Sequence, residues 1–326
     1  MTGPSVARLE ARVRSITWEA EGVLAFELVP WHSDHGFPAF TAGAHVDVQL
    51  GKGWARSYSL TNAPGETHRY CIAVNLDTAG RGGSRYVHDT FRAGQRVGLG
   101  LPRNHFALDE RATRSRLIAG GIGVTPLLCM VRRLVNLRRA WTLHHACRSR
   151  ARAPFFEELR ALEWASGGLG RFEAHFDDER GHVLDVGAIV GQLQADEQVY
   201  CCGPQPMLAA FKTATAGMPG ERVHLESFSA AEPPVTAGAA YSVTLARSGK
   251  TITVAPGQTL LAAVQAAGVA ALYSCGQGIC GTCEVRVLEG TPEHRDMVLG
   301  AVDRAAGDRM MICCSGSLTP SLVLDL

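Results

Sequence analysis

The chain has 326 residues, with 32 basic against 31 acidic side chains and a formal net charge of +1. This length allows two or three domains, and the even charge excludes a general attraction to nucleic acid or to a membrane surface. No apolar run reaches the length of a membrane span, and the first residues lack the apolar core of a signal peptide. We therefore expect a cytoplasmic protein, and nothing in the sequence requires more than a monomer.

Alternating apolar residues run through the first third of the chain. Leu24, Phe26 and Leu28 alternate with smaller or polar neighbours, and the pattern recurs over 46–50, 70–76 and 97–101. Glycine- and proline-containing turns separate these stretches, with no convincing helix between most of them. The pattern predicts an antiparallel β-barrel over residues 1–108.

Strand and helix patterns alternate between residues 109 and 228. A short buried strand over 117–119 runs into a glycine-rich loop, after which a helix begins at Pro126. Further strands are expected over 141–146, 171–176, 198–201 and 222–225, with helices over 155–162 and 206–214. This order predicts an α/β domain with a parallel sheet.

The composition changes again after residue 228. Residues 229–240 are small or polar apart from one valine, which is typical of a linker. Beyond it we expect a hairpin, then a short helix over 260–267 that ends at Gly268. Two more strands are expected over 284–287 and 310–313. Residues 241–326 therefore form a third domain.

Four of the ten cysteines follow one recognisable spacing, Cys275-x4-Cys280-x2-Cys283 with Cys313 further on. This is the arrangement of a plant-type [2Fe–2S] cluster. Two irons bridged by sulfides need four converging thiolates, three from one tight loop and one from a distant segment. A structural zinc site is the alternative, but zinc usually joins two short-spaced pairs. A set of disulfides or of core cysteines is the remaining alternative.

Glycines accompany these cysteines. Gly276, Gly278 and Gly281 let the loop curl and leave backbone N–H groups free to point at the sulfurs. Cys314 is the alternative fourth ligand.

A second motif, Arg56-Ser57-Tyr58-Ser59-Leu60, lies on an expected barrel strand. A flavin needs a hydrogen-bonding partner for N5, a flat apolar surface for its ring, and a cation for its phosphate. We assign these roles to Ser59, Tyr58 and Arg56 in that order.

Downstream, Gly80-Arg81-Gly82-Gly83-Ser84 is a glycine-rich turn that enters a helical stretch, where N–H groups and the Ser84 hydroxyl suit a phosphate. Each motif by itself is also typical of an ordinary strand or turn, but together they predict a flavin site.

The nicotinamide site is expected at the carboxyl edge of the parallel sheet. Gly120-Gly121-Ile122-Gly123-Val124-Thr125-Pro126 follows a strand and opens a helix, which suits a pyrophosphate. Cys202-Gly203-Pro204 follows another strand and should reach the same edge. Cys202 is either a neighbour of the nicotinamide ring or a small core residue. Arg148 and Ser149 either hold the adenosine end or belong to a solvated loop.

In this order the motifs resemble the phthalate dioxygenase reductase family, whose members serve Rieske-type oxygenases. The likeness also includes Pro102-Arg103-Asn104-His105-Phe106 and His224-Leu225-Glu226-Ser227-Phe228, and it covers nearly the whole chain. It implies a flavin barrel, a nicotinamide domain and a C-terminal β-grasp ferredoxin domain. Vanillate demethylase reductases are similar.

The resemblance also implies the cofactors and further site residues. It implies FMN, with FAD as the alternative, and NADH, with NADPH as the alternative because arginines crowd 148–152. The phosphate falls to Arg56 and to the turn Arg81-Gly82-Gly83-Ser84. Backbone at Ile72, Ala73 and Val74 flanks the ring, and Thr125 and Phe228 close it from the other domain.

The implied activity is electron transfer from NADH to FMN, then to [2Fe–2S], then to a terminal oxygenase. Ser59, Thr125 and Cys202 are the expected catalytic residues, because they align the nicotinamide with flavin N5. Two other classes stay open: a reductase that releases free reduced flavin, and a non-enzymatic redox sensor.

Overall fold

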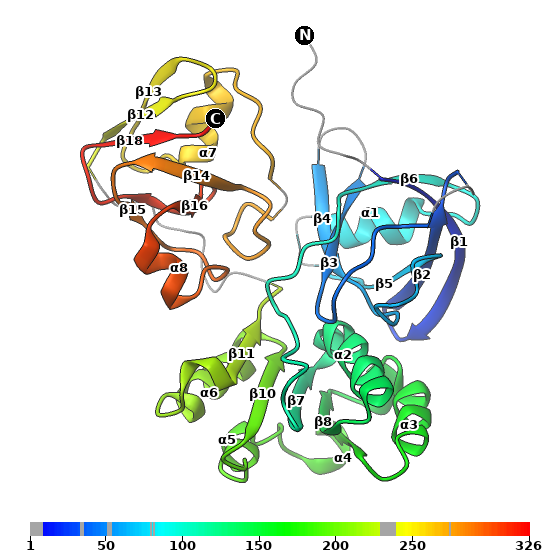
Figure 1. The fold of residues 1–326 in the computed structure, drawn as a ribbon. Helices are drawn as coiled ribbons and strands as arrows, with labels where there is room; N and C mark the ends of the chain where they lie inside the picture. Colours follow the sequence, from blue (N-terminus) through cyan, green and yellow to red (C-terminus); the bar gives the residue numbers. More distant parts are fainter. Residues whose placement is uncertain are drawn as a thin grey trace. The chain divides into compact units, whose positions relative to one another are not determined.

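The computed structural model describes residues 9–32, 36–50, 54–78, 80, 82–228, 239–273 and 275–326 (Figure 1). Its described chain divides into two compact units, one ending at Phe228 and the other within 239–326. Arg81 and residues 229–238 of the expected linker lie outside the described residues. Within the described chain, every helix falls short of the length and apolarity that a membrane crossing requires.

The first half of the larger unit is an antiparallel sheet. Among the described residues it has six strands in the order β4-β3-β6-β1-β2-β5. The elements are β1 (Leu9–Ala20), β2 (Val23–Pro30), β3 (His45–Leu50), β4 (Trp54–Ser59), β5 (Tyr70–Asn75), α1 (Gly83–Thr90) and β6 (Arg96–Leu99). Just beyond β4, the Thr61 N–H donates to the Cys71 carbonyl in β5 at 2.9 Å. This bond joins the two outermost strands, as a closed barrel requires.

The period-two pattern identified the barrel strands because alternate side chains enter one core. Phe26 and Leu28 of β2 and Ile72 of β5 are fully or almost fully buried. One expectation was wrong at its end: β6 stops at Leu99, and Leu101 is 41% exposed.

The second half of the larger unit is a parallel sheet with helices on it (Figure 1). The order within the described part is β11-β10-β7-β8-β9. The strands are β7 (Arg114–Gly120), β8 (Ala140–Cys147), β9 (Gly170–Phe176), β10 (Glu197–Cys202) and β11 (Val223–Glu226). The helices are η1 (Gly121–Gly123), α2 (Val124–Leu137), η2 (Arg150–Arg152), α3 (Phe156–Ala165), α4 (Asp177–Arg180), α5 (Val186–Val190), α6 (Gln205–Thr215) and η3 (Gly220–Arg222).

Helix α2 begins at Val124, two residues before the expected start at Pro126. A proline is tolerated in the first turn, where its missing N–H has no partner inside the helix. The buried stripe of α2 covers the sheet through Leu127, Val131 and Leu134, as its spacing predicts.

The smaller unit is a mixed sheet with a helix, the β-grasp arrangement. Its described strands are ordered β13-β12-β18-β14-β16, with β12 and β18 parallel. The elements are β12 (Tyr241–Leu245), β13 (Lys250–Val254), α7 (Leu260–Ala266), β14 (Glu284–Glu289), β15 (Pro292–Glu293), α8 (Ala301–Ala306), β16 (Arg309–Met311), β17 (Gly316–Ser317) and β18 (Ser321–Leu324). The strand expected over 310–313 ends at Met311, so Cys313 lies just beyond it.

Candidate redox sites

The four spaced cysteines lie together in the smaller unit and are all buried, with exposed fractions of 7, 5, 3 and 2% for Cys275, Cys280, Cys283 and Cys313. Contact with Cys275, followed by burial, raises the pKa of Cys280. Contact with Cys313, followed by burial, raises the pKa of Cys283. Cys280 therefore lies against Cys275 and Cys283 against Cys313, and the Cys313 sulfur also contacts that of Cys314.

Pairs are what a [2Fe–2S] cluster requires, because each of its two irons takes two protein ligands. Among the described residues, no three or more His, Cys, Asp or Glu side chains are grouped around one ion position. The buried, paired thiols fit the cluster, and bound iron would take them as thiolates.

Backbone N–H groups of the loop point at these sulfurs. Gln277 N–H donates to Cys275 Sγ at 3.2 Å, and Gly278 N–H donates to Cys313 Sγ at the same distance. Gly278 has a φ of +71°, a conformation that only glycine adopts readily. Such bonds favour the charged state of a thiolate and tune the potential of a bound cluster.

Cys314 contacts Cys313, and this contact lowers the pKa of the Cys314 thiol against the opposing effect of burial. It is buried, and its thiol points toward the Met311 carbonyl at 3.6 Å. A Cβ added to Gly278 would lie 2.5 Å from Cys314 Sγ, so this sulfur packs against the back of the loop. The position beside Cys283 therefore belongs to Cys313, and the ligand role of Cys313 stays a prediction.

A segment that sequence reasoning missed supports the loop from the same side. Asp296 is buried, and its Oδ1 accepts the N–H groups of Val298 and Leu299 at 2.9 and 2.7 Å. The next residue, Met297, donates its N–H to the Gly278 carbonyl at 2.8 Å. No apolar period marks this irregular stretch, although an aspartate before two turn residues is a recognised turn signal.

The expected phosphate site of the flavin brings Arg56 of β4 to the beginning of α1. A Cβ added to Gly83 would lie 2.9 Å from both Cγ and Nε of Arg56. Gly82, which precedes the helix, has a φ of +84°. An arginine beside a glycine-only helix start forms a cradle that a side chain at residue 83 would fill, and this fits a phosphate.

The serines of this region have hydrogen-bond partners within the protein. Ser57 donates its hydroxyl to Asp47 Oδ1 at 2.6 Å. The Ser84 hydroxyl accepts the Asp77 N–H at 2.9 Å, so it ties down the preceding turn. Ser59 is buried at the end of β4, and burial raises the pKa of Tyr58 to about 12 against the opposing effect of Arg56.

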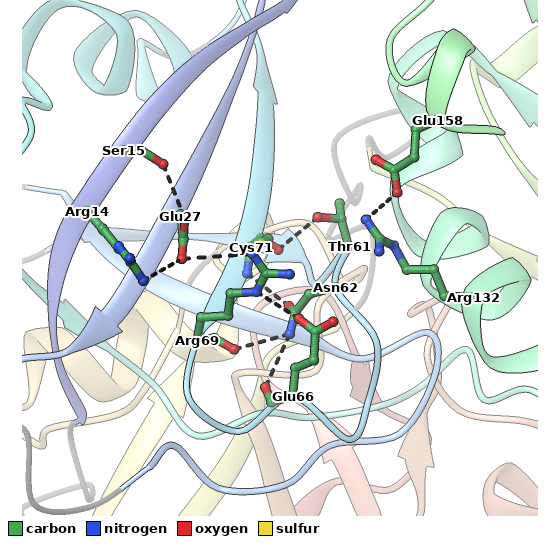
Figure 2. Close-up of polar contacts among 10 residues, drawn as sticks. All are labelled: Arg14, Ser15, Glu27, Thr61, Asn62, Glu66, Arg69, Cys71, Arg132 and Glu158. Atoms are coloured by element: carbon green, nitrogen blue, oxygen red, sulfur yellow. Dashed lines mark hydrogen bonds and ion pairs between the residues drawn. The ribbon is translucent and has the colours of Figure 1, made fainter. Parts of the chain in front are cut away.

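The connection from β4 to β5 is fixed by a buried asparagine that sequence reasoning missed. Asn62 accepts the Cys71 N–H through Oδ1 at 2.9 Å and donates from Nδ2 to the carbonyls of Glu66 and Arg69. The Arg69 side chain in turn pairs with Glu66 at 2.7 Å (Figure 2). This network holds the end of β4, with Ser59, beside the start of β5.

Strand β5 carries the residues expected to flank the flavin ring, and Ile72, Ala73 and Val74 are all buried. His88 of α1, which sequence reasoning also missed, contacts the Val74 carbonyl through Nε2 at 2.9 Å. Strand β5 lies next to η1 of the parallel sheet. The flavin strand and the glycine loop are thus neighbours within the larger unit.

The two nicotinamide motifs meet at the carboxyl edge of the parallel sheet. A Cβ added to Gly120 would lie 2.5 Å from Pro204 Cδ, and one added to Gly123 would lie 2.2 Å from the Cys202 carbonyl oxygen. These contacts leave no room for side chains, which explains the glycines. Gly121 has a φ of +52° and its carbonyl contacts His145 Nε2 at 3.0 Å.

Around this edge, Thr125 is buried and donates its hydroxyl to the Ile122 carbonyl at 3.0 Å. Phe228 is 43% exposed after β11. Arg148 and Ser149 follow β8, and the Arg148 carbonyl accepts the Asp178 N–H at 3.1 Å.

A buried carboxyl lies beside Cys202, and sequence reasoning did not assign it a role. Burial raises the pKa of Glu226 to about 8. Its Oε2 is buried without a hydrogen-bond partner among the described residues. Burial, followed by the charge of Glu226, raises the pKa of Cys202. A raised pKa favours the neutral thiol form of Cys202, which is the less nucleophilic form.

A flavin-type barrel, a parallel sheet with a phosphate loop and a β-grasp unit with paired thiols define a pyridine-nucleotide-dependent iron–sulfur oxidoreductase. Residues 243–316 match the family model of the 2Fe-2S iron-sulfur cluster binding domain. Residues 117–213 match that of the oxidoreductase NAD-binding domain.

Two curated relatives match over the whole chain. Phenoxybenzoate dioxygenase subunit beta of Ectopseudomonas oleovorans is 48% identical over 322 residues, 99% of this chain and 98% of that protein. Tetrachlorobenzoquinone reductase of Sphingobium chlorophenolicum is 47% identical over 330 residues, 100% of both chains.

Two solved structures are also similar. Phthalate dioxygenase reductase, described as a modular structure for electron transfer from pyridine nucleotides to [2Fe-2S], matches with a TM-score of 0.71 and 35% identity over 98% of both chains. An intact type IV self-sufficient cytochrome P450 monooxygenase matches 98% of this chain with a TM-score of 0.89 and 36% identity, and this chain spans 41% of its length. The chain belongs to the phthalate dioxygenase reductase family. It is an NAD(P)H-dependent flavin and iron–sulfur oxidoreductase.

Proposed function

We propose that the chain is the NADH-dependent reductase component of a Rieske-type oxygenase or demethylase system. Electrons pass from NADH to FMN, then to the [2Fe–2S] cluster, then to the terminal oxygenase. One observation carries this proposal: a single chain combines the paired thiols of residues 275–313 with the glycine loop packed against Cys202. When bound, the flavin supplies the conversion from a two-electron hydride donor to one-electron acceptors.

Each group of residues has a defined task in this proposal. Arg56 with the start of α1 holds the flavin phosphate. Ser59 directs its hydroxyl to N5 of the ring, and Thr125 with Cys202 orients the nicotinamide. The loop at Gly121 and Gly123 receives the pyrophosphate. No residue acts as a general base in this proposal, because hydride transfer needs none.

The four thiolates Cys275, Cys280, Cys283 and Cys313 hold the cluster in this proposal, and loop N–H groups tune its potential. Plant-type clusters have reduction potentials of about −400 mV, so electrons leave the cluster favourably only to a partner of higher potential. A Rieske centre has such a potential. The name of one relative, phenoxybenzoate dioxygenase subunit beta, supports an oxygenase as the partner.

The proposal includes the organisation expected from the sequence: a flavin domain over 1–108, a nicotinamide domain over 109–228, a linker over 229–240 and a ferredoxin domain over 241–326. It also takes the chain as a monomer and as a cytoplasmic protein, the latter because thiolate ligands need a reducing compartment.

Rapid mixing of the reconstituted holoprotein with NADH tests the electron order. We expect flavin absorbance to fall first and cluster absorbance to fall afterwards, with no loss of either in the absence of NADH. Cluster reduction that is as fast in FMN-free protein as in holoprotein would contradict the proposed order.

A second candidate function is the reduction of a small quinone. The 47% identity with tetrachlorobenzoquinone reductase along the full chain favours it. A Cys280→Ser variant that still binds FMN separates the two functions. Direct quinone reduction at the flavin survives this change, whereas delivery to an oxygenase through the cluster is lost.

A further inference from the structure

Helix α1 is hydrogen-bonded along one face to strand β5 and to the turn that follows this strand. His88 Nε2 contacts the Val74 carbonyl in β5 at 2.9 Å. The Ser84 hydroxyl accepts the Asp77 N–H at 2.9 Å, just beyond the strand. Ser84 and His88 are four residues apart, so they lie on the same face of the helix. The helix and the strand are therefore joined at two separate points of the backbone.

His88 is the donor in its contact with the strand. A carbonyl oxygen only accepts hydrogen bonds, so the imidazole proton that makes this bond is carried by Nε2. The His88 side chain is half-buried, and partial shielding from water strengthens such a bond. The Val74 carbonyl is therefore held in a fixed direction by a side chain of α1.

The beginning of β5 is fixed as well. Thr61 donates its N–H to the Cys71 carbonyl at 2.9 Å, and Asn62 Oδ1 accepts the Cys71 N–H at 2.9 Å. Strand β5 is an outermost strand of the described sheet, so these groups and His88 act where a second neighbouring strand would otherwise pair. Residues 72–74, which are expected to flank the flavin ring, therefore lie between two anchored points, at Cys71 and at Val74.

Helix α1 also begins at the expected phosphate site. A Cβ added to Gly83 would lie 2.9 Å from two atoms of Arg56, and Gly83 is the first residue of the helix. An α-helix rises about 1.5 Å per residue, so His88 lies about 7–8 Å along the axis from Gly83. The helix thus contacts the strand of the ring a fixed distance away from the phosphate.

We propose that His88 is a positioning residue for the flavin, which holds the ring-flanking strand in register with the phosphate site through the Val74 carbonyl. The inference deepens the proposed function and rests on its flavin site. Hydride transfer requires the ring in one place, because a displacement on the order of 1 Å can cost about a hundredfold in rate. Loss of the His88 bond should therefore lower the rate of flavin reduction more than it lowers the affinity for FMN.

The test compares His88→Leu and His88→Gln with the original chain as holoprotein, with FMN bound at full occupancy. Leucine removes the donor, whereas glutamine can donate from Nε2 to the same carbonyl. On rapid mixing with NADH, His88→Leu should reduce its flavin about tenfold more slowly at saturating NADH. The NADH concentration that gives half the maximal rate should change less than about twofold. His88→Gln should return the maximal rate to within about twofold of the original.

The flavin ring gives a second readout that needs no electron transfer. The visible circular dichroism of bound FMN, recorded without NADH, should change in His88→Leu and return toward the original in His88→Gln. The matched control is His68→Leu, which removes an exposed imidazole from the connection between β4 and β5. It should leave the reduction rate and the dichroism unchanged.

Three results would overturn the inference. They are an unchanged reduction rate and dichroism in His88→Leu, a loss of rate that His88→Gln does not restore, and a lower Tm with an unchanged rate at full FMN occupancy. The last result would mean that the bond serves stability alone. If the flavin responds as expected while NADH fails to reduce the cluster, the proposed function is contradicted and the positioning role of His88 is supported.

Discussion

Gly278 donates its backbone N–H to Cys313 Sγ at 3.2 Å while its carbonyl accepts the Met297 N–H at 2.8 Å. Both backbone polar groups of Gly278 are therefore hydrogen-bonded. The residue before Met297 is Asp296, whose Oδ1 accepts two further backbone N–H groups. A Cβ added to Gly278 would lie 3.1 Å from the Asp296 Cα, so this carboxylate belongs to the immediate surroundings of the thiol loop.

Asp296→Asn should raise the reduction potential of the cluster. An asparagine oxygen can accept the same two N–H groups, so the turn is kept while a negative charge is removed. Less negative charge near the cluster favours its reduced form, and we expect a rise on the order of tens of millivolts. A spectroelectrochemical titration measures it.

The matched control for this change is Asp303→Asn, which removes an acidic charge in α8 without touching the Gly278 peptide. A potential that moves equally in both variants would mean that Asp296 acts only through the net charge of the unit.

Alanine at Cys313 should remove the cluster, whereas alanine at Cys314 should leave it in place. Cys313 lies in contact with Cys283, whereas the Cys314 thiol contacts Cys313 and points to the Met311 carbonyl. We expect Cys313→Ala to lose nearly all iron and acid-labile sulfide. Cys314→Ala should keep both, at a cost of about 1 kcal/mol in stability from the lost packing. If the iron content fell in Cys314→Ala and not in Cys313→Ala, the ligand assignment would be reversed.

Sequence patterns located the parts of the fold that depend on local periodicity or on fixed spacing. The cysteine loop and the glycine loop at Gly120 are defined by neighbours in the chain, so both were identifiable. Asn62 and His88 act through backbone groups of other segments, and no local pattern marks such bonds.

The roles of hydroxyl groups were equally hard to infer. Ser57 and Ser84 belong to motifs expected to bind the flavin, and within the protein they bond to Asp47 and to the Asp77 backbone. A sequence gives the type of a side chain, whereas its partner depends on register and on the strand that pairs beside it.

Arg56→Gln should weaken FMN binding specifically through the phosphate. The Arg56 side chain lies against Gly83 at the start of α1, where a phosphate would accept its N–H groups. We expect the affinity of the flavin-free protein for FMN to fall by about tenfold or more, as measured by quenching of flavin fluorescence. Riboflavin, which has no phosphate, should bind the variant and the original chain equally.

The control for that change is Arg14→Gln, an exposed arginine of the same barrel that pairs with Glu27 at 3.4 Å. It should bind FMN normally. A riboflavin affinity that drops as much as the FMN affinity in Arg56→Gln would show that the arginine supports the strand and not the phosphate.

Glu226 should make the stability of the larger unit depend on pH. Its pKa is raised from the ordinary 4.5 to about 8 because burial disfavours the charged carboxylate. The folded state therefore holds a proton that the unfolded state releases above its own pKa. Stability attributable to this group is unaffected below about 4.5, falls as the pH rises toward 8, and stays reduced above it.

Glu226→Gln keeps the side chain neutral at every pH and removes this dependence. Between pH 6 and pH 9 the original chain should lose on the order of 2 kcal/mol more than the variant, about 4–8 °C in Tm, followed by flavin release on heating. Glu157→Gln, an exposed acid on α3, should behave like the original chain. If Glu226→Gln lost as much stability over this range as the original chain, the carboxyl would already be ionised at pH 6 and its burial would not govern its charge.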